Sequence, residues 1–185
     1  MKLSTIAFAT LIAGGIAWNA HAGPTLADIN KAAIGTEAKA NTIKLQTLLA
    51  RANASPGVID GLMGQSTTDA IEAFERMNGF DVDGELDEKV KKALPSGDVV
   101  KTYTITEEDA AYDLTGDIPD RYDEMAKLDK MGFQSHAEMI AERFEMDIDL
   151  LKELNPEADF AKAGTKVIVT DVRAQDARKV TKIEI

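Results

Sequence analysis

The chain offers few residues for nucleophilic or acid–base chemistry. It contains no cysteine and two histidines, of which His21 lies in an apolar N-terminal segment and His136 in the body of the chain. Ser135 precedes His136, but no Gly-x-Ser-x-Gly motif surrounds a serine, and the spacing of Ser135 and Glu138 is typical of a helix N-cap. The sequence therefore predicts a protein without catalytic residues.

Metal chemistry is not indicated either. His136 stands near Glu138 and Glu142, but it lacks the second histidine that the common zinc-binding spacings require. The acidic run at residues 81–87 does not fit a calcium loop, because Gly79 falls where the first aspartate of an EF-hand is needed. A solvated acidic turn explains this run, and we expect neither a metal ion nor another cofactor.

The charge balance excludes several classes of partner. Lys and Arg number 21 and Asp and Glu number 32, which gives a formal net charge of −11 without any basic cluster. Such a surface repels nucleic acid and anionic lipid headgroups, so we expect no nucleic-acid partner. The absence of cysteine also excludes disulfides, and stability must come from packed apolar cores.

The N-terminus has the pattern of an export signal. Lys2 is followed by an apolar run over residues 3–18, and Ala20-His21-Ala22 precedes Gly23 as a small-residue cleavage site. The run is too short for a lasting membrane span; the alternative is a buried N-terminal helix. We predict a signal peptide at residues 1–22, cleavage after Ala22, a periplasmic location and no membrane span in the mature chain.

Two modules are predicted to follow a lead-in. Residues 23–40 are rich in alanine and predict a flexible or marginally helical segment. Residues 41–96, the first module, predict three helices, ending at the breaker Pro95-Ser96-Gly97. Apolar side chains recur at helical spacing in the first two helices, at Leu45, Leu48, Leu49 and Ala52 and then at Ala70, Ile71, Phe74 and Met77. The third helix is expected to begin near Asp87.

A glycine-rich turn precedes the second of these helices. We expect positive φ at Gly61 and Gly64, where the chain reverses tightly. Ser66 and Asp69 have the spacing of a capping box at the helix start. Gly79 is the expected C-terminal stop.

This turn and helix resemble the peptidoglycan-binding-like domain of bacterial cell-wall enzymes. The matching residues are Asp60, Gly61, Gly64, Thr67, Ala70, Ile71 and Phe74, while Glu75 stands where the family usually has glutamine. The resemblance implies a three-helix module that binds peptidoglycan, either its glycan or its stem peptide. Its candidate contacts are the polar groups of the loop and helix, namely Asp60, Gln65, Thr67 and Arg76.

Residues 97–174, the second module, predict the order strand, helix, helix, strand. This order resembles the lysin motif (LysM), through Tyr103-Thr-Ile, Ile140 to Phe144, Leu150 to Pro156, and Ala163 to Val167. Asn155 is the candidate contact in this module. The family's Gly-Asp-Thr-Leu after the first strand is replaced by residues 106–109, and a helical insertion continues to about Gly132. The predicted fold class is thus mostly α with a small α+β part.

The order of the segments resembles the N-terminal half of periplasmic L,D-transpeptidases. Residues 175–185 then predict either the first strand of a missing catalytic domain or a terminal strand paired within the second module. The favoured interpretation is a non-catalytic periplasmic protein that binds peptidoglycan, with a cell-wall enzyme as a further implied partner. The alternatives are a truncated L,D-transpeptidase without its catalytic cysteine domain and a protein-interaction module.

Overall fold

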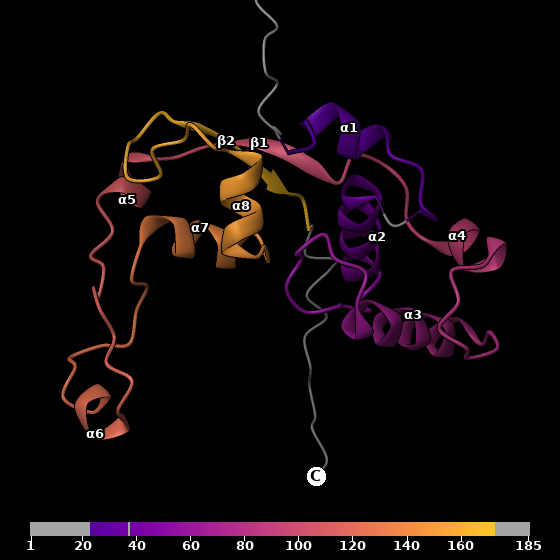
Figure 1. Cartoon of the computed structure of the whole chain (residues 1–185), viewed down its shortest axis with the longest axis horizontal. Coiled ribbons are helices and arrows are strands. Elements are labelled where there is room, and N and C mark those ends of the chain that lie inside the picture. The colour runs from indigo at the N-terminus through magenta and orange to yellow at the C-terminus, as the bar shows by residue number, and fades with distance from the viewer. Residues whose placement is uncertain (1–22, 37, 173–185) are drawn as a thin grey trace, which may run out of the picture.

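The computed structural model describes residues 23–36 and 38–172, and Figure 1 shows how their elements are arranged. Within these residues the chain is mostly helical with one two-stranded antiparallel sheet, which confirms the predicted class at this level. The elements are α1 (Leu26–Lys31), α2 (Lys39–Arg51), α3 (Gln65–Asn78), α4 (Glu88–Ala93), β1 (Val100–Thr104), α5 (Glu107–Ala110), α6 (Tyr122–Met125), α7 (His136–Arg143), α8 (Ile148–Leu154) and β2 (Lys166–Thr170).

In the first module α3 packs against α2, and α4 packs against α3. The apolar faces of these helices are buried because their side chains recur every three or four residues, as at Leu45, Leu48 and Leu49 of α2. Ile71 and Phe74 of α3 are buried in the same core. Asp87 caps α4 by accepting a hydrogen bond from the Val90 N–H, at the start predicted for the third helix.

The start of α3 differs from the prediction. The helix begins at Gln65 with Gly64 as its N-cap, so the expected capping box of Ser66 and Asp69 is wrong. The Thr67 hydroxyl is buried within 3.2 Å of the Gln46 Nε2, and this contact holds the first turn against α2. The helix thereby begins two residues earlier than predicted. At its other end Gly79 has a φ of 67° and stops α3 as predicted.

The buried face of α3 also turns away from Met77. Met77 is 58 % exposed, contrary to its predicted place in the core, whereas Glu75 is 2 % exposed. The Glu75 carboxylate accepts hydrogen bonds from the N–H groups of Asp83 and Gly84. Because these bonds draw the following loop over the Glu75 side of the helix, the Met77 side remains in solvent.

The second module is built on the pairing of β1 with β2. Val100 lies opposite Thr170, and Tyr103 lies opposite Val167. The helices α7 and α8 lie between the strands in sequence and pack against each other, and α8 also contacts β2. The order of strand, helices and strand is therefore as expected.

The insertion between β1 and α7 forms a limb at residues 112–133, which projects at the left of Figure 1. Its two sides are joined by a hydrogen bond from the Thr115 N–H to the Phe133 carbonyl, 2.9 Å. The rings of Tyr112 and Phe133 lie 5.5 Å apart at its base. The helical insertion expected to continue to about Gly132 forms the short α6 here, and Tyr122 is 87 % exposed because no described element covers it.

The lead-in, expected to be flexible or marginally helical, contains the short helix α1. Thr25 caps α1, and Ile29 is fully buried against the core. The Asn30 side chain accepts hydrogen bonds from the Val99 and Val100 N–H groups and donates one to the Val100 carbonyl. The sequence pattern left the choice between a flexible and a helical segment open, because the stability of α1 depends on these distant partners.

The two modules are joined directly. Ile59 of the first module and Met146 of the second form a parallel β-bridge, in which the Ile59 N–H donates to the Glu145 carbonyl at 2.8 Å. Arg51 of α2 donates hydrogen bonds from its guanidinium to the carbonyl oxygens of Asp98 and Asp171. We infer that the two modules form one packed unit rather than two independent domains.

Some predictions lie outside the described residues. These are the signal peptide at residues 1–22 and the terminal strand at residues 175–185. Among the residues that the structure describes, no helix has the length and apolar character needed to cross a membrane.

Candidate functional site

The glycine-rich turn at residues 57–64 is the common wall of several surface hollows. The first, of about 330 Å³, lies between this turn and the start of α3. Its lining residues are Gln46, Pro56, Gly57, Val58, Asp60, Leu62, Gly64, Ser66 and Thr67. All of them belong to the first module.

Gln46 of α2 positions the turn, and the sequence analysis missed it. Its side chain is 2 % exposed, and its Oε1 accepts a hydrogen bond from the Gly61 N–H at 2.9 Å. Its Nε2 lies 2.8 Å from the Asp60 Oδ1 and 3.1 Å from the Leu62 carbonyl. The sequence signal for it is a glutamine next to the apolar face of a helix. A glutamine buried at such a position needs several hydrogen-bond partners, and the turn supplies them.

The two glycines of the turn behave differently. Gly61 has a φ of 72°, as predicted, and a Cβ there would lie 2.9 Å from side-chain atoms of Ile43 and Lys39. Gly64 has a φ of −129°, so the expected positive φ at Gly64 is wrong. The reversal is completed by Gly61, and Gly64 is already extended as the helix N-cap.

The structure brings two of the predicted contact residues to this hollow. Asp60 and Thr67 both line it. The Oδ1 of Asp60 accepts hydrogen bonds from Gln46 and from the Leu62 N–H, and its Oδ2 has no hydrogen-bond partner among residues 23–36 and 38–172. Thr67 is buried and shapes the wall. Gln65 is exposed in the first turn of α3, where its Nε2 donates to Asp69.

The other two predicted contacts lie elsewhere. Arg76 is exposed in the last turn of α3, at the end away from the turn. Asn155 is 9 % exposed and hydrogen-bonds the Leu151 carbonyl, the Ile168 N–H and the Ile168 carbonyl. These bonds fasten α8 to β2, so Asn155 has a structural role here. The five residues do not form one site.

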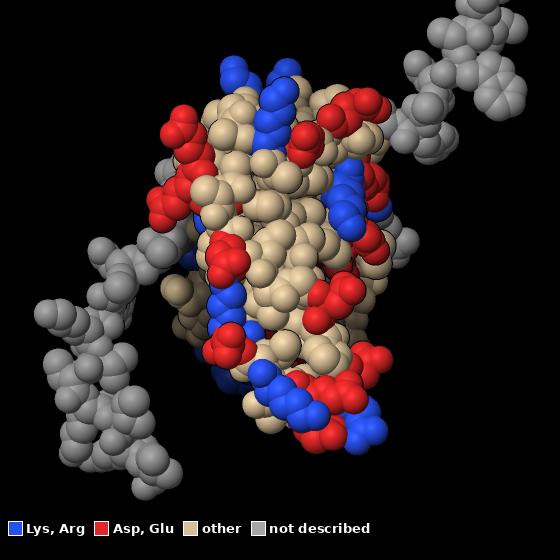
Figure 2. Space-filling model, turned by 90° about the vertical axis from the view of Figure 1, so that its left-hand side faces the viewer, with Lys and Arg blue, Asp and Glu red and all other residues tan. Residues whose placement is uncertain are grey.

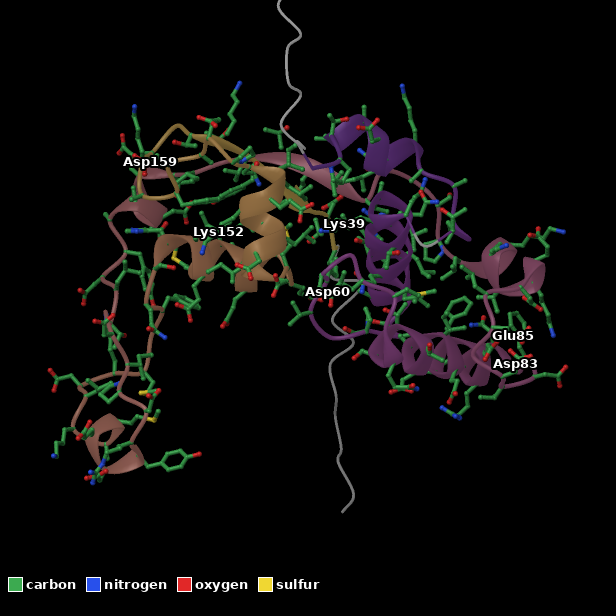
Figure 3. All side chains as sticks on the ribbon, viewed as in Figure 1. Lys39, Asp60, Asp83, Glu85, Lys152 and Asp159 are labelled. Carbon is green, nitrogen blue, oxygen red and sulfur yellow. The ribbon has the colours of Figure 1, made fainter. Side chains whose placement is uncertain are left out.

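Two further hollows share the turn with the second module. One, of about 310 Å³, is lined by Lys39, Asp60, Leu62, Asp147, Asp149, Leu150 and Glu153. The other, of about 450 Å³, is lined by Val58, Gln134, Ser135, Glu138, Ala141, Glu142, Met146, Asp147 and Ile148, and we call it the junction groove. Figure 3 shows Lys39 and Asp60 in the region between α2 and α8. Asp60 and Val58 therefore lie where the two modules meet.

A separate ion cluster anchors the limb. Asp109 of α5 accepts hydrogen bonds from the Tyr103 hydroxyl and from Arg143. Burial acts to raise the pKa of Asp109, but the hydrogen bonds from Tyr103, Thr106 and Arg143 outweigh it and hold this pKa far below its usual range. Burial also raises the pKa of the Tyr103 hydroxyl. The hollows around the turn are lined by other residues than Asp109, Tyr103 and Arg143.

The arrangement offers groups that can bind a ligand. The three hollows present carboxylates, exposed apolar side chains and backbone groups. Within residues 23–36 and 38–172, no group of three His, Asp or Glu side chains could hold a metal ion. The Nε2 of His136 lies 3.2 Å from the Ala110 carbonyl, so this imidazole is hydrogen-bonded to the backbone at the base of the limb.

Comparison with known families identifies the first module. Residues 39–94 match a family described as a putative peptidoglycan binding domain. The matched segment contains the whole turn, Gln46 and every residue of the first hollow. The chain therefore carries a domain of this type over less than half of its length. No curated protein matched the chain. The LysM and L,D-transpeptidase resemblances stay predictions.

Proposed function

We propose that this chain is a non-catalytic, exported protein that binds peptidoglycan through the hollow at the 57–64 turn. The observation that carries the proposal is the coincidence of two findings. The family match covers residues 39–94, and the hollow is built entirely from residues within that segment.

The surface of the hollow fits a polar polymer that also carries methyl groups. Leu62 and Val58 are 60 % and 57 % exposed and offer apolar contacts. The Oδ2 of Asp60 can accept a hydrogen bond from an amide or hydroxyl group, and Ser66 is exposed beside it. Small-ligand sites commonly combine apolar walls with a few oriented polar groups.

Export and the lack of catalysis rest on the sequence. The segment before Gly23 has the order of charge, apolar run and small residues of a signal peptide. No cysteine exists in the 185 residues to serve as the nucleophile of an L,D-transpeptidase. Intact-mass measurement of protein from a periplasmic extract is expected to show Gly23 as the first residue. Full-length protein in the cytoplasm would contradict export.

Binding is tested by co-sedimentation of residues 23–172 with purified peptidoglycan sacculi. Leu62→Ser should reduce the sedimented fraction, because Leu62 lines the hollow. Met77→Ser is the matched control, since Met77 is 58 % exposed and lines none of the three hollows around the turn. Both replacements remove a solvent-exposed side chain and should leave the melting temperature nearly unchanged.

Two results would contradict the proposal. If the parent protein stays in the supernatant, it does not bind peptidoglycan. If Leu62→Ser and Met77→Ser sediment equally well, the hollow at the turn is not the binding surface.

A further inference from the structure

The junction groove combines an apolar floor with an acidic rim. Val58 of the first module and Ala141, Met146 and Ile148 of the second provide apolar surface. Glu138, Glu142 and Asp147 are the ionisable residues of its lining, and no lysine or arginine lines it. A bound molecule would therefore meet apolar atoms below and carboxylates around it.

The rim carboxylates retain free oxygens. Glu142 is exposed, and its carboxylate has no hydrogen-bond or ion-pair partner among the described residues. One oxygen of Glu138 accepts the Gln134 N–H, and the Oδ1 of Asp147 caps α8, which leaves one oxygen of each without a partner in the described part of the chain. The neighbouring hollow adds Asp60 and Asp149.

The charge of this region fits a cationic group. Lys39 is the basic residue that lines the neighbouring hollow, and its Nζ is already paired with Glu153. On the face that Figure 2 shows, uncharged residues run down the middle and both acidic and basic side chains lie along the edges, so the acidic lining is a property of the groove and not of this whole face. Complementary charge orients a ligand and excludes the wrong one, so the groove favours a ligand with an ammonium group.

We propose that the junction groove binds the peptide stem of peptidoglycan through the free amine of its diamino acid. This inference rests on the proposed function and names the part of the polymer that is bound. The glycan is a weaker fit, because its sugars carry no cation and no aromatic residue lines the groove to stack on a sugar ring. The stem carries the polymer's ammonium group together with alanine methyl groups that match the floor.

The position of the groove makes both modules necessary. Val58 is held by the backbone bridge of its neighbour Ile59 to Met146, and the rim residues come from α7 and the start of α8. The matched family segment ends at residue 94 and thus supplies one wall only.

The test is calorimetric titration of the exported chain, residues 23–185, with three probes. These are the tripeptide N-acetyl-L-Ala-γ-D-Glu-L-Lys, whose one free amine is on the lysine side chain, the same tripeptide acetylated on that side-chain amine as well, and the disaccharide GlcNAc-MurNAc. We expect the free tripeptide to bind and acetylation to weaken it about tenfold, which corresponds to the loss of one charge-assisted hydrogen bond.

Charge reversal locates the site. Glu142→Lys should weaken the tripeptide by a similar factor of about tenfold. Glu85→Lys is the matched control, because Glu85 is exposed and lies at the far edge of the molecule from Asp60 in Figure 3. The control should bind as the parent does.

The outcomes separate this inference from the proposed function. Binding of the disaccharide but not of the tripeptide, or equal binding by Glu142→Lys and the parent, overturns the inference. Sedimentation of the parent with sacculi, in the separate assay of the proposed function, would then leave the proposed function intact. If the unrelated peptide Gly-Gly-Lys binds as tightly as the tripeptide, the groove is a docking site for basic protein segments and the inference is again overturned. No sedimentation with sacculi overturns both.

Discussion

A single buried amide organises the turn that we propose as a binding site. Gln46 reaches Asp60, Gly61, Leu62 and Thr67 from one position on α2. Each of these bonds is local in space but spans fourteen or more residues in sequence. The shape of the hollow thus depends on the buried side chain of Gln46, whose amide group holds the turn by hydrogen bonds from the interior of the module.

The same replacement at the two turn glycines should have opposite effects. Gly61→Ser is expected to lower the free energy of unfolding by about 1–3 kcal/mol, because φ is positive there and Ile43 and Lys39 crowd the new Cβ. Gly64→Ser should be neutral or slightly stabilising, since the backbone is extended and serine is a preferred N-cap. Urea denaturation of both variants checks this. Equal effects would show that the turn is assigned wrongly.

Asp109 gives a pH-dependent prediction. Asp109→Asn should destabilise the protein by about 1–3 kcal/mol near neutral pH, because the hydrogen bonds to the buried carboxylate are weakened. The pKa of Asp109 is lower in the folded than in the unfolded chain, so its contribution is full above about pH 4 and is lost as the pH falls further.

The difference in unfolding free energy between parent and Asp109→Asn is therefore expected to shrink below about pH 4. Urea denaturation at a series of pH values measures it. Glu108→Gln is the control, since Glu108 is exposed on the same helix. A difference that stays constant from pH 7 to pH 3 would contradict the role of the ionised carboxylate.

At the scale of elements, short helices are held by contacts with distant parts of the chain. The six residues of α1 are too few for a stable isolated helix, and the helix persists because Ile29 is buried and Asn30 binds the start of β1. The limb is attached in a similar way, through Asp109 of α5.

Asn30→Ala tests the attachment of α1. The variant leaves the N–H groups of Val99 and Val100 without their side-chain acceptor, which should cost about 1–3 kcal/mol of unfolding free energy. Lys31→Ala is the control, because Lys31 is exposed on the same helix. The prediction is checked by thermal melting together with amide hydrogen exchange at Val99 and Val100. Unchanged exchange in Asn30→Ala would contradict it.

At the scale of the whole molecule, the two modules share one interface. Ile59 is fully buried and bridges to the second module, and Arg51 donates hydrogen bonds to the backbone just before β1 and just after β2. Separating the modules would expose Ile59 and leave a buried guanidinium without those acceptors, and both changes are costly.

We therefore expect residues 23–172 to unfold in a single cooperative transition. The isolated family segment, residues 39–94, should melt at a lower temperature than the same segment within the longer chain. Calorimetry of the longer chain and circular dichroism of both chains provide the comparison. The modules would be independent if residues 23–172 showed two separate transitions and the segment 39–94 melted at the same temperature alone as within the longer chain.

The sequence alone determined the features that depend on local chemistry. The predicted features include the helical periodicity of Leu45, Leu48 and Leu49, the stop at Gly79, the start of the third helix near Asp87 and the reversal at Gly61. Each follows from the conformational or hydrophobic preference of single residues. The family pattern around Asp60 also lies within a short stretch of chain, and the match to residues 39–94 agrees with it.

Only the tertiary structure decided how these parts are used. Gln46 and Glu75 are polar residues whose burial is offset by partners far along the chain, so no local pattern marks them as interior. Several other features depend on such distant partners as well. They are the start of α3 at Gln65 with Gly64 as its N-cap, the exposure of Met77, the hydrogen bonds of Asn155 to β2, and the formation of α1. The junction groove exists because Val58 meets α7 and α8, and that meeting depends on long-range packing, which a sequence pattern cannot specify.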